Sequence, residues 1–279
     1  MSHPAAPGDD VMGNGVFRAV LEGYDAVYDA LPRGETFNRL WRMNAYHGDF
    51  PEPFAHIGFL TAAEAQRLHG MLHIRPGEVL VDLACGAGGP GLWMARESGA
   101  SLIGIDPSAA GLAAAHQRAT GVGLADRARF QHGTFEQTNL ADAAAGAVMS
   151  IEALQYAPGK GAAFAEFARI MRPGARIGIV CFEVDPAKVE GLPILGVDPV
   201  ADYQPVIAAA GLNVEAYEET PGWEERVYAA FSAILENNDT LIAEMGEPAA
   251  AAAAAEAMLT IQIKPYPRRI MAVASRPDV

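Results

Sequence analysis

The chain has 279 residues, of which 51% are hydrophobic and 19% are charged, which suits one large domain with a substantial core. Its formal net charge of −14 argues against a nucleic-acid partner, because phosphate backbones are bound by basic faces. No apolar run approaches the roughly 18 residues of a membrane-spanning helix, and the N-terminus lacks the apolar segment of a signal peptide. We expect a cytoplasmic protein without a nucleic-acid or membrane partner. No Cys/His spacing resembles a metal site, so no metal is expected.

The N-terminal part is expected to form a flexible tail followed by helices. Residues 1–15 are rich in Pro, Gly and Asp, and residues 16–60 are interpreted as a helical cap. Apolar residues at helical spacing predict one helix over 16–31 and a second over 35–46. The loop at 46–54 carries aromatic residues and prolines. It is either a packed connection or a cover over a pocket.

Strands and helices alternate in the core, which we place at residues 61–186. Thr61 and Glu64 have the spacing of a capping box, which opens a helix that ends near residue 72. Ser108 is expected to cap a helix over 109–119. The expected strands, including two beyond the core, are residues 78–84, 101–106, 128–132, 147–151, 176–183, 213–218 and 269–275. Strands separated by helices of this length predict a parallel sheet with helices on both faces.

Residues 187–279 are expected to supply the last two strands and a helical insertion between them. The insertion, at about 222–263, includes seven consecutive alanines at 249–255, which favour a helix because Ala has the highest helix propensity. Forty helical residues are too many for a simple hairpin. With residues 186–200 they are expected to form a lid or a dimer surface, so the protein is a monomer or a homodimer.

The run from Val79 to Gly91 is the most informative stretch of the sequence. A short apolar strand carrying Asp82 leads into a glycine-rich turn, and a helix follows. Glycines at such a turn let a ligand approach the backbone, and the helix N-terminus offers unpaired N–H groups. The pattern predicts a binding turn for a polar small molecule.

Two patterns compete for this turn. Gly86, Gly88 and Gly91 match the dinucleotide fingerprint, and Asp106 lies twenty residues beyond Gly86, where a ribose-binding acid belongs. Asp82 followed by Gly86 and Gly88 also matches the pattern of class I methyltransferases that use S-adenosyl-L-methionine (SAM). The rest of the chain must therefore decide between the two.

Four motifs in order resemble those of a class I SAM-dependent methyltransferase, of the small-molecule type found in bacterial secondary metabolism. They are the segments 81–91, 104–108, 150–154 and 172–174. The resemblance covers roughly residues 61–279. The dinucleotide interpretation accounts for the first two motifs only, so an NAD(P)-dependent oxidoreductase is the remote alternative.

The resemblance implies a fold and a cofactor. The fold is α/β, a Rossmann-like doubly wound sheet of seven strands with a helical cap, in which the last strand is antiparallel and lies between the fifth and sixth. SAM would lie across the carboxyl ends of the first and fourth strands, where open α/β sheets bind ligands. No metal is needed for this chemistry.

The resemblance also implies cofactor contacts around the glycine turn. Gly86 and Gly88 would admit the methionine part of SAM, with Asp82 beneath them and Ala84 beside them. Asp106 would accept both ribose hydroxyls, which suits a carboxylate.

Further implied contacts come from the third and fourth strands and from Pro107, which follows Asp106. Phe135 would lie against adenine, and Thr134 stands where the family often has an acid that bonds the adenine amino group. Ile151 and Glu152 would flank the methionine end.

The sequence says least about a catalytic base. In-line methyl transfer needs mainly positioning, and a base matters only where the acceptor must lose a proton. Relatives that methylate sugar hydroxyls often carry His after the fourth strand and an acid at the end of the fifth. This chain has Gln155 and Tyr156 at the first place, and Glu183 just beyond the second. We take Tyr156 and Glu152 as catalytic candidates.

Three histidines, His47, His56 and His132, are further titratable candidates. His47 ranks first because its loop could close over the site.

Aromatic residues gather in the expected cap, where most should be core and a share should face the acceptor: Tyr24, Tyr28, Trp41, Tyr46, Phe50, Trp223, Tyr228 and Phe231. They favour a small, largely apolar or aromatic metabolite as methyl acceptor, with O- or N-methylation ahead of C-methylation. Aromatic faces beside Glu152 or Glu183 could steady a cation, as C-methylation of an alkene or terpenoid-like acceptor requires. A SAM-binding cyclase or auxiliary protein that transfers no methyl group is the other alternative.

Overall fold

The computed structural model describes residues 11–192 and 198–278 and is built around one seven-stranded sheet. The strand order is β3-β2-β1-β4-β5-β7-β6. The bounds of the strands are β1 Val79–Leu83, β2 Ser101–Asp106, β3 Ala128–His132, β4 Ala145–Ile151, β5 Met171–Phe182, β6 Asn213–Glu219 and β7 Arg269–Ser275. Each predicted strand is present, with bounds that differ mainly at the start of β5.

The pairing of the strands confirms the predicted topology. β1 pairs in parallel with β2 and β4, and the pairs β2–β3 and β4–β5 are parallel as well. β7 is antiparallel to both neighbours, β5 and β6. The seventh strand therefore lies between the fifth and sixth, and the reversal of strand order between β1 and β4 creates a switch point at their carboxyl ends.

Helices cover both faces of the sheet. α3 (Ala62–Leu72), α4 (Gly89–Ser98) and α5 (Ala109–Gly121) pack on one face, and α6 (Lys160–Ile170) and α8 (Gln204–Ala209) on the other. The predicted caps are present, because the Thr61 side chain accepts from Glu64 N and the Ser108 side chain accepts from Gly111 N. The short elements are η1 Leu31–Arg33, η2 Glu52–Phe54, η3 Leu154–Tyr156 and α7 Pro186–Val189.

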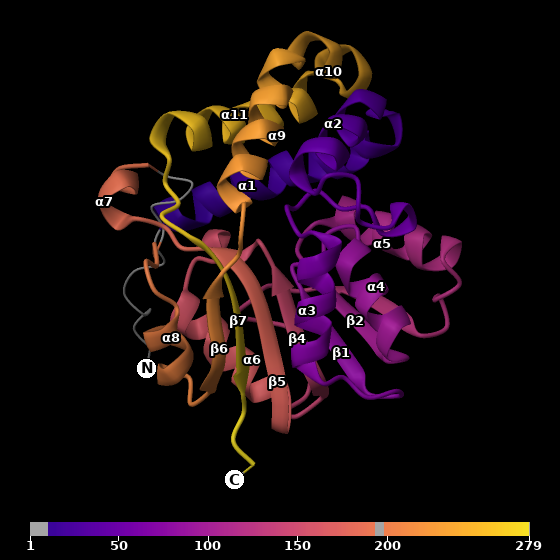
Figure 1. Ribbon diagram of the computed structural model, residues 1–279, viewed down its shortest axis with the longest axis vertical. Coiled ribbons are helices and arrows are strands. Elements are labelled where there is room, and N and C mark those ends of the chain that lie inside the picture. Colours follow the sequence, from indigo (N-terminus) through magenta and orange to yellow (C-terminus); the bar gives the residue numbers. More distant parts are fainter. Residues whose placement is uncertain (1–10, 193–197, 279) are drawn as a thin grey trace, which may run out of the picture.

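A helical cap lies at one end of the sheet (Figure 1). It consists of α1 (Val11–Ala30), α2 (Glu35–Ala45), α9 (Trp223–Glu236), α10 (Asn238–Met245) and α11 (Glu247–Ile263). α1 packs against α11, and α2 packs against α9. The first helices of the chain and the late insertion thus form one layer. Within the described residues, no helix is both long and apolar enough to cross a bilayer.

Three boundaries differ from the predictions. α1 begins at Val11, inside the predicted tail. The helix runs through Gly13 and Gly15 although glycine has low helix propensity. β5 begins at Met171 because the chain enters the sheet through an irregular stretch with a register shift against β4. The insertion is three helices, with a break at Gly246, where φ is +87°. The remainder of the predicted tail, residues 1–10, lies outside the described residues.

Candidate functional site

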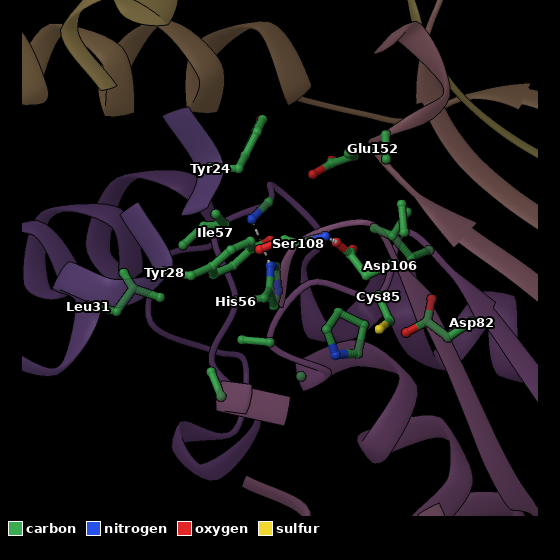
Figure 2. Close-up of a pocket in the computed structure, with 18 of the residues that line it drawn as sticks. Tyr24, Tyr28, Leu31, His56, Ile57, Asp82, Cys85, Asp106, Ser108 and Glu152 are labelled. Atoms are coloured by element: carbon green, nitrogen blue, oxygen red, sulfur yellow. Dashed lines mark hydrogen bonds between the residues drawn. The ribbon is translucent and has the colours of Figure 1, made fainter. Parts of the chain in front are cut away.

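The carboxyl ends of β1, β2 and β4 open into a cavity of about 850 Å³, which side chains of α1 and α2 also line. Figure 2 shows Tyr24 and Tyr28 of α1 in its wall. Its size lies within the roughly 300–1,000 Å³ that is usual for ligand pockets. Nine residues singled out from the sequence line it, namely Asp82, Ala84, Asp106, Pro107, Thr134, Phe135, Ile151, Glu152 and Tyr156. Gly86 and Gly88 lie in the turn at its edge. The described part of segment 186–200 lines neither this cavity nor the smaller one described below, and residues 193–197 lie outside the described residues.

The glycine turn and its acid fit together as the spacing predicted. Asp82 ends up beside the first turn of α4, where a Cβ on Gly91 would stand 2.3 Å from its Oδ2 atom. Glycine is therefore required there for the helix to approach the strand. Burial raises the pKa of Asp82 to about 8, and the nearby Asp106 carboxylate adds to the rise.

Asp106, at the end of β2, is held by backbone amides on either side. Its Oδ2 accepts from Gly86 N at 2.7 Å and its Oδ1 accepts from Ser108 N at 2.8 Å. Burial raises its pKa to about 6, and these two hydrogen bonds oppose the rise. Each carboxylate oxygen keeps a further lone pair, so the group can accept hydroxyl donors from a ligand in the cavity.

Tyr28 of α1 covers the glycine turn, a contact that the sequence did not reveal. Its hydroxyl lies over Gly86, where a Cβ would stand 2.1 Å away, and Figure 2 shows the ring between α1 and the turn. The same helix is tied to the N-terminus of α5, because Ser108 Oγ donates to Asp25 Oδ1 at 2.5 Å. A ligand that reaches Gly86 must therefore contact or displace Tyr28.

The side of the cavity formed after β3 is lined by Thr134 and Phe135. Phe135 is buried and packs edge-on against Phe167 of α6, with ring centroids 5.9 Å apart. The Thr134 hydroxyl accepts from Gln137 N, and its own N–H donates to Gln137 O. The turn after β3 is thereby held in shape, with one aromatic face available beside the cavity.

Glu152 follows β4 in a left-handed conformation, with φ +55°. Its Oε1 accepts from Arg269 Nε at 2.6 Å and its Oε2 accepts from Phe59 N at 2.5 Å. Burial raises the pKa of Glu152, and the Arg269 guanidinium opposes that rise. Glu152 is thus an ion-paired carboxylate in the cavity wall.

Arg269 continues this ion pair into a buried network. The Arg269 side chain has no solvent exposure, and it donates to Glu64 Oε1 at 2.9 Å and to Thr220 Oγ1 at 2.7 Å. Arg226 of α9 donates to the same Glu64 at 2.8 Å. The capping glutamate of α3 therefore joins the sheet, the cavity wall and the cap.

A smaller cavity of about 190 Å³ adjoins the first. Tyr24, Glu152 and Tyr156 line both. The Tyr156 hydroxyl donates to Glu256 Oε1 at 2.6 Å, and the Tyr24 hydroxyl lies 3.5 Å from Glu256 Oε2. Six further aromatic side chains line this cavity, namely Phe37, Trp41, Phe59, Phe182, Phe231 and Tyr266.

The histidines do not form the expected catalytic group. His47 is exposed and lines neither cavity, because the chain at 46–54 packs Tyr46 and Phe50 inward and leaves His47 outside. His132 is exposed as well. His56 does line the larger cavity, but its Nδ1 accepts from Gly58 N and its Nε2 pairs with Leu60 O. Burial lowers the pKa of His56 to about 3, so the ring is neutral near pH 7.

Glu183 lies away from both cavities. Its carboxylate accepts from Arg268 Nε at 2.6 Å and from the Tyr217 hydroxyl at 2.5 Å. The pair links the ends of β5, β6 and β7. Glu183 therefore lines neither cavity, and only Glu152 of the two acids considered for steadying a cation does so.

Two polar residues of the site were missed in the sequence, although each left a signal. Arg269 begins an otherwise apolar strand, and a buried arginine there requires a carboxylate partner. Glu256 directly follows the run of alanines in α11, and an acid in the middle of such an apolar helix is a candidate for a specific contact.

Comparison with known proteins agrees with this architecture. Residues 81–179 match the family model described as a methyltransferase domain. The chain is 29% identical over 218 residues to 27-O-demethylrifamycin SV methyltransferase from Amycolatopsis mediterranei (strain S699). The aligned region covers 72% of this chain and 78% of that protein.

Two solved structures are similar in fold. The [4+2]-cyclase SpnF superposes with a TM-score of 0.68 at 20% identity, over 99% of each chain. Phosphoethanolamine N-methyltransferase 2 from Haemonchus contortus, solved in complex with SAM, gives a TM-score of 0.64 at 17% identity, over 86% of this chain and 60% of that one. The family match decides against the dinucleotide interpretation. Residues 81–179 therefore form a methyltransferase domain, whose cofactor is SAM, and the chain is similar to class I SAM-dependent methyltransferases in sequence and in fold.

Proposed function

We propose that this enzyme transfers a methyl group from SAM to a small, largely apolar or aromatic metabolite in secondary metabolism, by O- or N-methylation. The observation that carries the proposal is the pair of adjoining cavities. The larger one opens at the switch point of the sheet, and the smaller one is walled mainly by aromatic side chains under the cap. In this proposal the larger cavity holds the cofactor and the smaller one holds the acceptor.

The residues around the larger cavity fit SAM by the chemistry of their donors and acceptors. Asp106, with lone pairs left on both oxygens, would accept the ribose hydroxyls. Phe135 would lie against the adenine ring, with Thr134 and Pro107 beside it. Ala84 and Ile151 would line the remaining wall. When bound, SAM supplies a methyl group on a sulfonium that is its own leaving group.

Glu152 would act by positioning. Its carboxylate is held by Arg269 and by Phe59 N–H, so it presents a fixed charge at the junction of the two cavities. The cap would exclude water from this junction, because α1, α2 and α11 all contribute to the walls. Tyr156 and Tyr24 stand at the same junction, and the Tyr156 hydroxyl would contact the acceptor.

Calorimetric titration with SAM, S-adenosylhomocysteine and NAD tests the cofactor site. We expect the first two to bind and NAD not to bind. Replacing Asp106 by Ala should lower SAM affinity by about 30-fold or more, because hydrogen bonds to a charged group contribute roughly 1.5–3 kcal/mol each. Asp126→Ala, at an exposed position, is the matched control and should leave the affinity unchanged. An Asp106→Ala variant that binds SAM normally would contradict the ribose assignment.

A SAM-binding cyclase or auxiliary role is the second candidate. The fold similarity to the [4+2]-cyclase extends over 99% of the chain, cap included. C-methylation of an alkene is also compatible with the aromatic walls, which can stabilise a cation. Formation of S-adenosylhomocysteine during incubation with candidate acceptors separates methyl transfer from cyclisation, and the position of the methyl group in the product identifies the atom.

A further inference from the structure

Glu256 is a carboxylate in the smaller cavity that no described cation neutralises. Three other buried glutamates each pair with arginine: Glu64 with Arg226 and Arg269, Glu152 with Arg269, and Glu183 with Arg268. Within residues 11–192 and 198–278, Glu256 forms no such ion pair, and its partners are the hydroxyls of Tyr24 and Tyr156.

The titratable groups that face Glu256 do not supply the missing charge. They are Tyr24 on α1, Tyr156 on η3, Tyr266 ahead of β7, and Glu152. The charge of Glu152 is already balanced by Arg269. Burial raises the pKa of Glu256 above its ordinary value, and the neighbouring Glu152 adds to this. A carboxylate in such a place is neutralised either by a proton or by a cationic ligand.

A second acceptor in the same cavity also lacks a donor. Gln155 lines the cavity and donates through Nε2 to Glu152 O at 2.8 Å. Its Oε1 is buried and has no hydrogen-bond partner among the described residues. An ammonium group offers up to three donors and no acceptor, and so it complements a carboxylate and an amide oxygen together.

The remaining walls suit an organic cation on an apolar framework. Trp41 lies 5.2 Å from Phe59 and 5.8 Å from Phe231, and Phe182 lies 4.4 Å from Tyr266, between ring centroids. Aromatic faces attract cations, and their edges and faces also accept apolar groups. Ala252, one helical turn before Glu256 on α11, keeps this side of the cavity free of bulk.

We propose that the smaller cavity binds the protonated amine of a small, largely apolar molecule, with Glu256 as its counter-ion and Gln155 Oε1 as a second acceptor. The inference rests on the proposed function in treating this amine as the methyl acceptor. The same carboxylate would take the proton that the ammonium must lose before its nitrogen can be methylated. The N–H bond breaks, the proton passes to a Glu256 oxygen, and the nitrogen keeps the electron pair.

Two probes of equal skeleton test this: 2-phenylethylamine, which is protonated at pH 7.5, and 2-phenylethanol, which is neutral. Each is titrated calorimetrically into the wild-type protein, with and without S-adenosylhomocysteine. We expect the amine to bind about tenfold more tightly or better, in the range of desolvated cation–π and charged hydrogen-bond energies. Glu256→Gln should remove this preference while the affinity for the alcohol stays within about twofold.

Glu247→Gln is the matched control, because it makes the same charge change at an exposed position of the same helix. It should keep the preference for the amine. An amine that fails to bind, or that binds wild-type protein no more tightly than the alcohol, overturns the inference without any variant. A preference that survives in Glu256→Gln overturns it as well. S-adenosylhomocysteine binding without amine preference defeats this inference alone, whereas amine preference without S-adenosylhomocysteine binding defeats the cofactor assignment alone.

Discussion

The sheet side and the cap side of the paired cavities handle buried negative charge in different ways. On the sheet side, Asp106 is held by backbone N–H groups of adjacent turns, and Glu152 is held by Arg269 at the start of β7. On the cap side, Glu256 is held by tyrosine hydroxyls from two other elements. The first arrangement is fixed by the backbone and an ion pair, and the second leaves a carboxylate without a cationic partner among the described residues.

This difference suits the two sides to different ligands. Backbone donors and a buried arginine position the sheet-side carboxylates before any ligand arrives, which suits a cofactor that is the same in every turnover. The cap-side carboxylate lies on α11, and the aromatic residues Tyr24, Trp41 and Phe231 beside the same cavity also lie on cap helices, outside the sheet. We infer that the cap carries the choice of acceptor.

Removing Arg269 should have the largest effect, because Glu152 would then lack an arginine partner, as Glu256 does, and Glu64 would keep only Arg226. Arg269→Met leaves two buried carboxylates without this cation, and breaking a buried pair costs about 3–5 kcal/mol. Urea unfolding should show a loss of that size in the free energy of unfolding. Arg67→Met removes an exposed pair with Glu218 and should change stability little. A loss below about 1 kcal/mol in Arg269→Met would argue that the sheet-side pair is not needed for stability.

The charge on Asp82 should make stability depend on pH. Its pKa is about 8 in the folded protein and near 3.8 when unfolded, so the folded state binds the proton more tightly. The free energy of unfolding should therefore fall as pH rises from about 4 to about 8.

Asp82→Asn should lack this fall. Urea unfolding gives the free energy of unfolding of the variant relative to the wild type. This difference should shift in favour of the variant by more than about 1 kcal/mol from pH 5 to pH 8, since one pKa unit corresponds to roughly 1.4 kcal/mol. Asp126→Asn, at an exposed position, is the control and should follow the wild type. If the free energies of unfolding of Asp82→Asn and the wild type differ by the same amount at pH 5 and pH 8, Asp82 is already ionised at pH 5.

Tyr156→Phe should have the smallest effect, and it probes the cap side. Glu256 loses a donor at 2.6 Å, which should cost about 1 kcal/mol of stability. SAM affinity should change by less than about threefold, because the cofactor contacts lie on the sheet side, and turnover should fall more than SAM binding. Tyr228→Phe, which keeps the ring beside Lys264, is the control for stability and SAM affinity. A loss of SAM affinity as large as that in Asp106→Ala would place Tyr156 on the cofactor side.

Much of the sheet side could be predicted because its signals are local. Alternating apolar strands and helices indicated the seven strands, and the spacing of Asp82, Gly86 and Gly91 describes one strand, one turn and one helix start. Asp106 could be added because parallel neighbours bring their carboxyl ends to one edge of the sheet. The resemblance to SAM-dependent methyltransferases implied the positions of Ala84, Pro107, Thr134 and Phe135, and all four line the cavity.

The cap side could not be read in this way. Tyr156 and Glu256 are 100 residues apart, and Glu152 and Arg269 are 117 apart, so no local pattern connects them. His47 was favoured because its loop could close over the site, yet the packing of Tyr46 and Phe50 turns it outward. Side-chain direction in an irregular loop depends on which neighbours fill the core, and spacing along the chain does not specify that.

The sequence by itself determined the fold class and the glycine turn, because backbone conformation and hydrophobic periodicity are encoded in short segments. Only the tertiary structure decided which carboxylates are neutralised. Arg269 reaches Glu152 and Glu64, whereas Glu256 meets only tyrosine hydroxyls among the described residues. The partners of a buried carboxylate are set by folding, which brings together groups that are distant in the sequence. The lack of a cationic partner for Glu256 could therefore be found only in the tertiary structure.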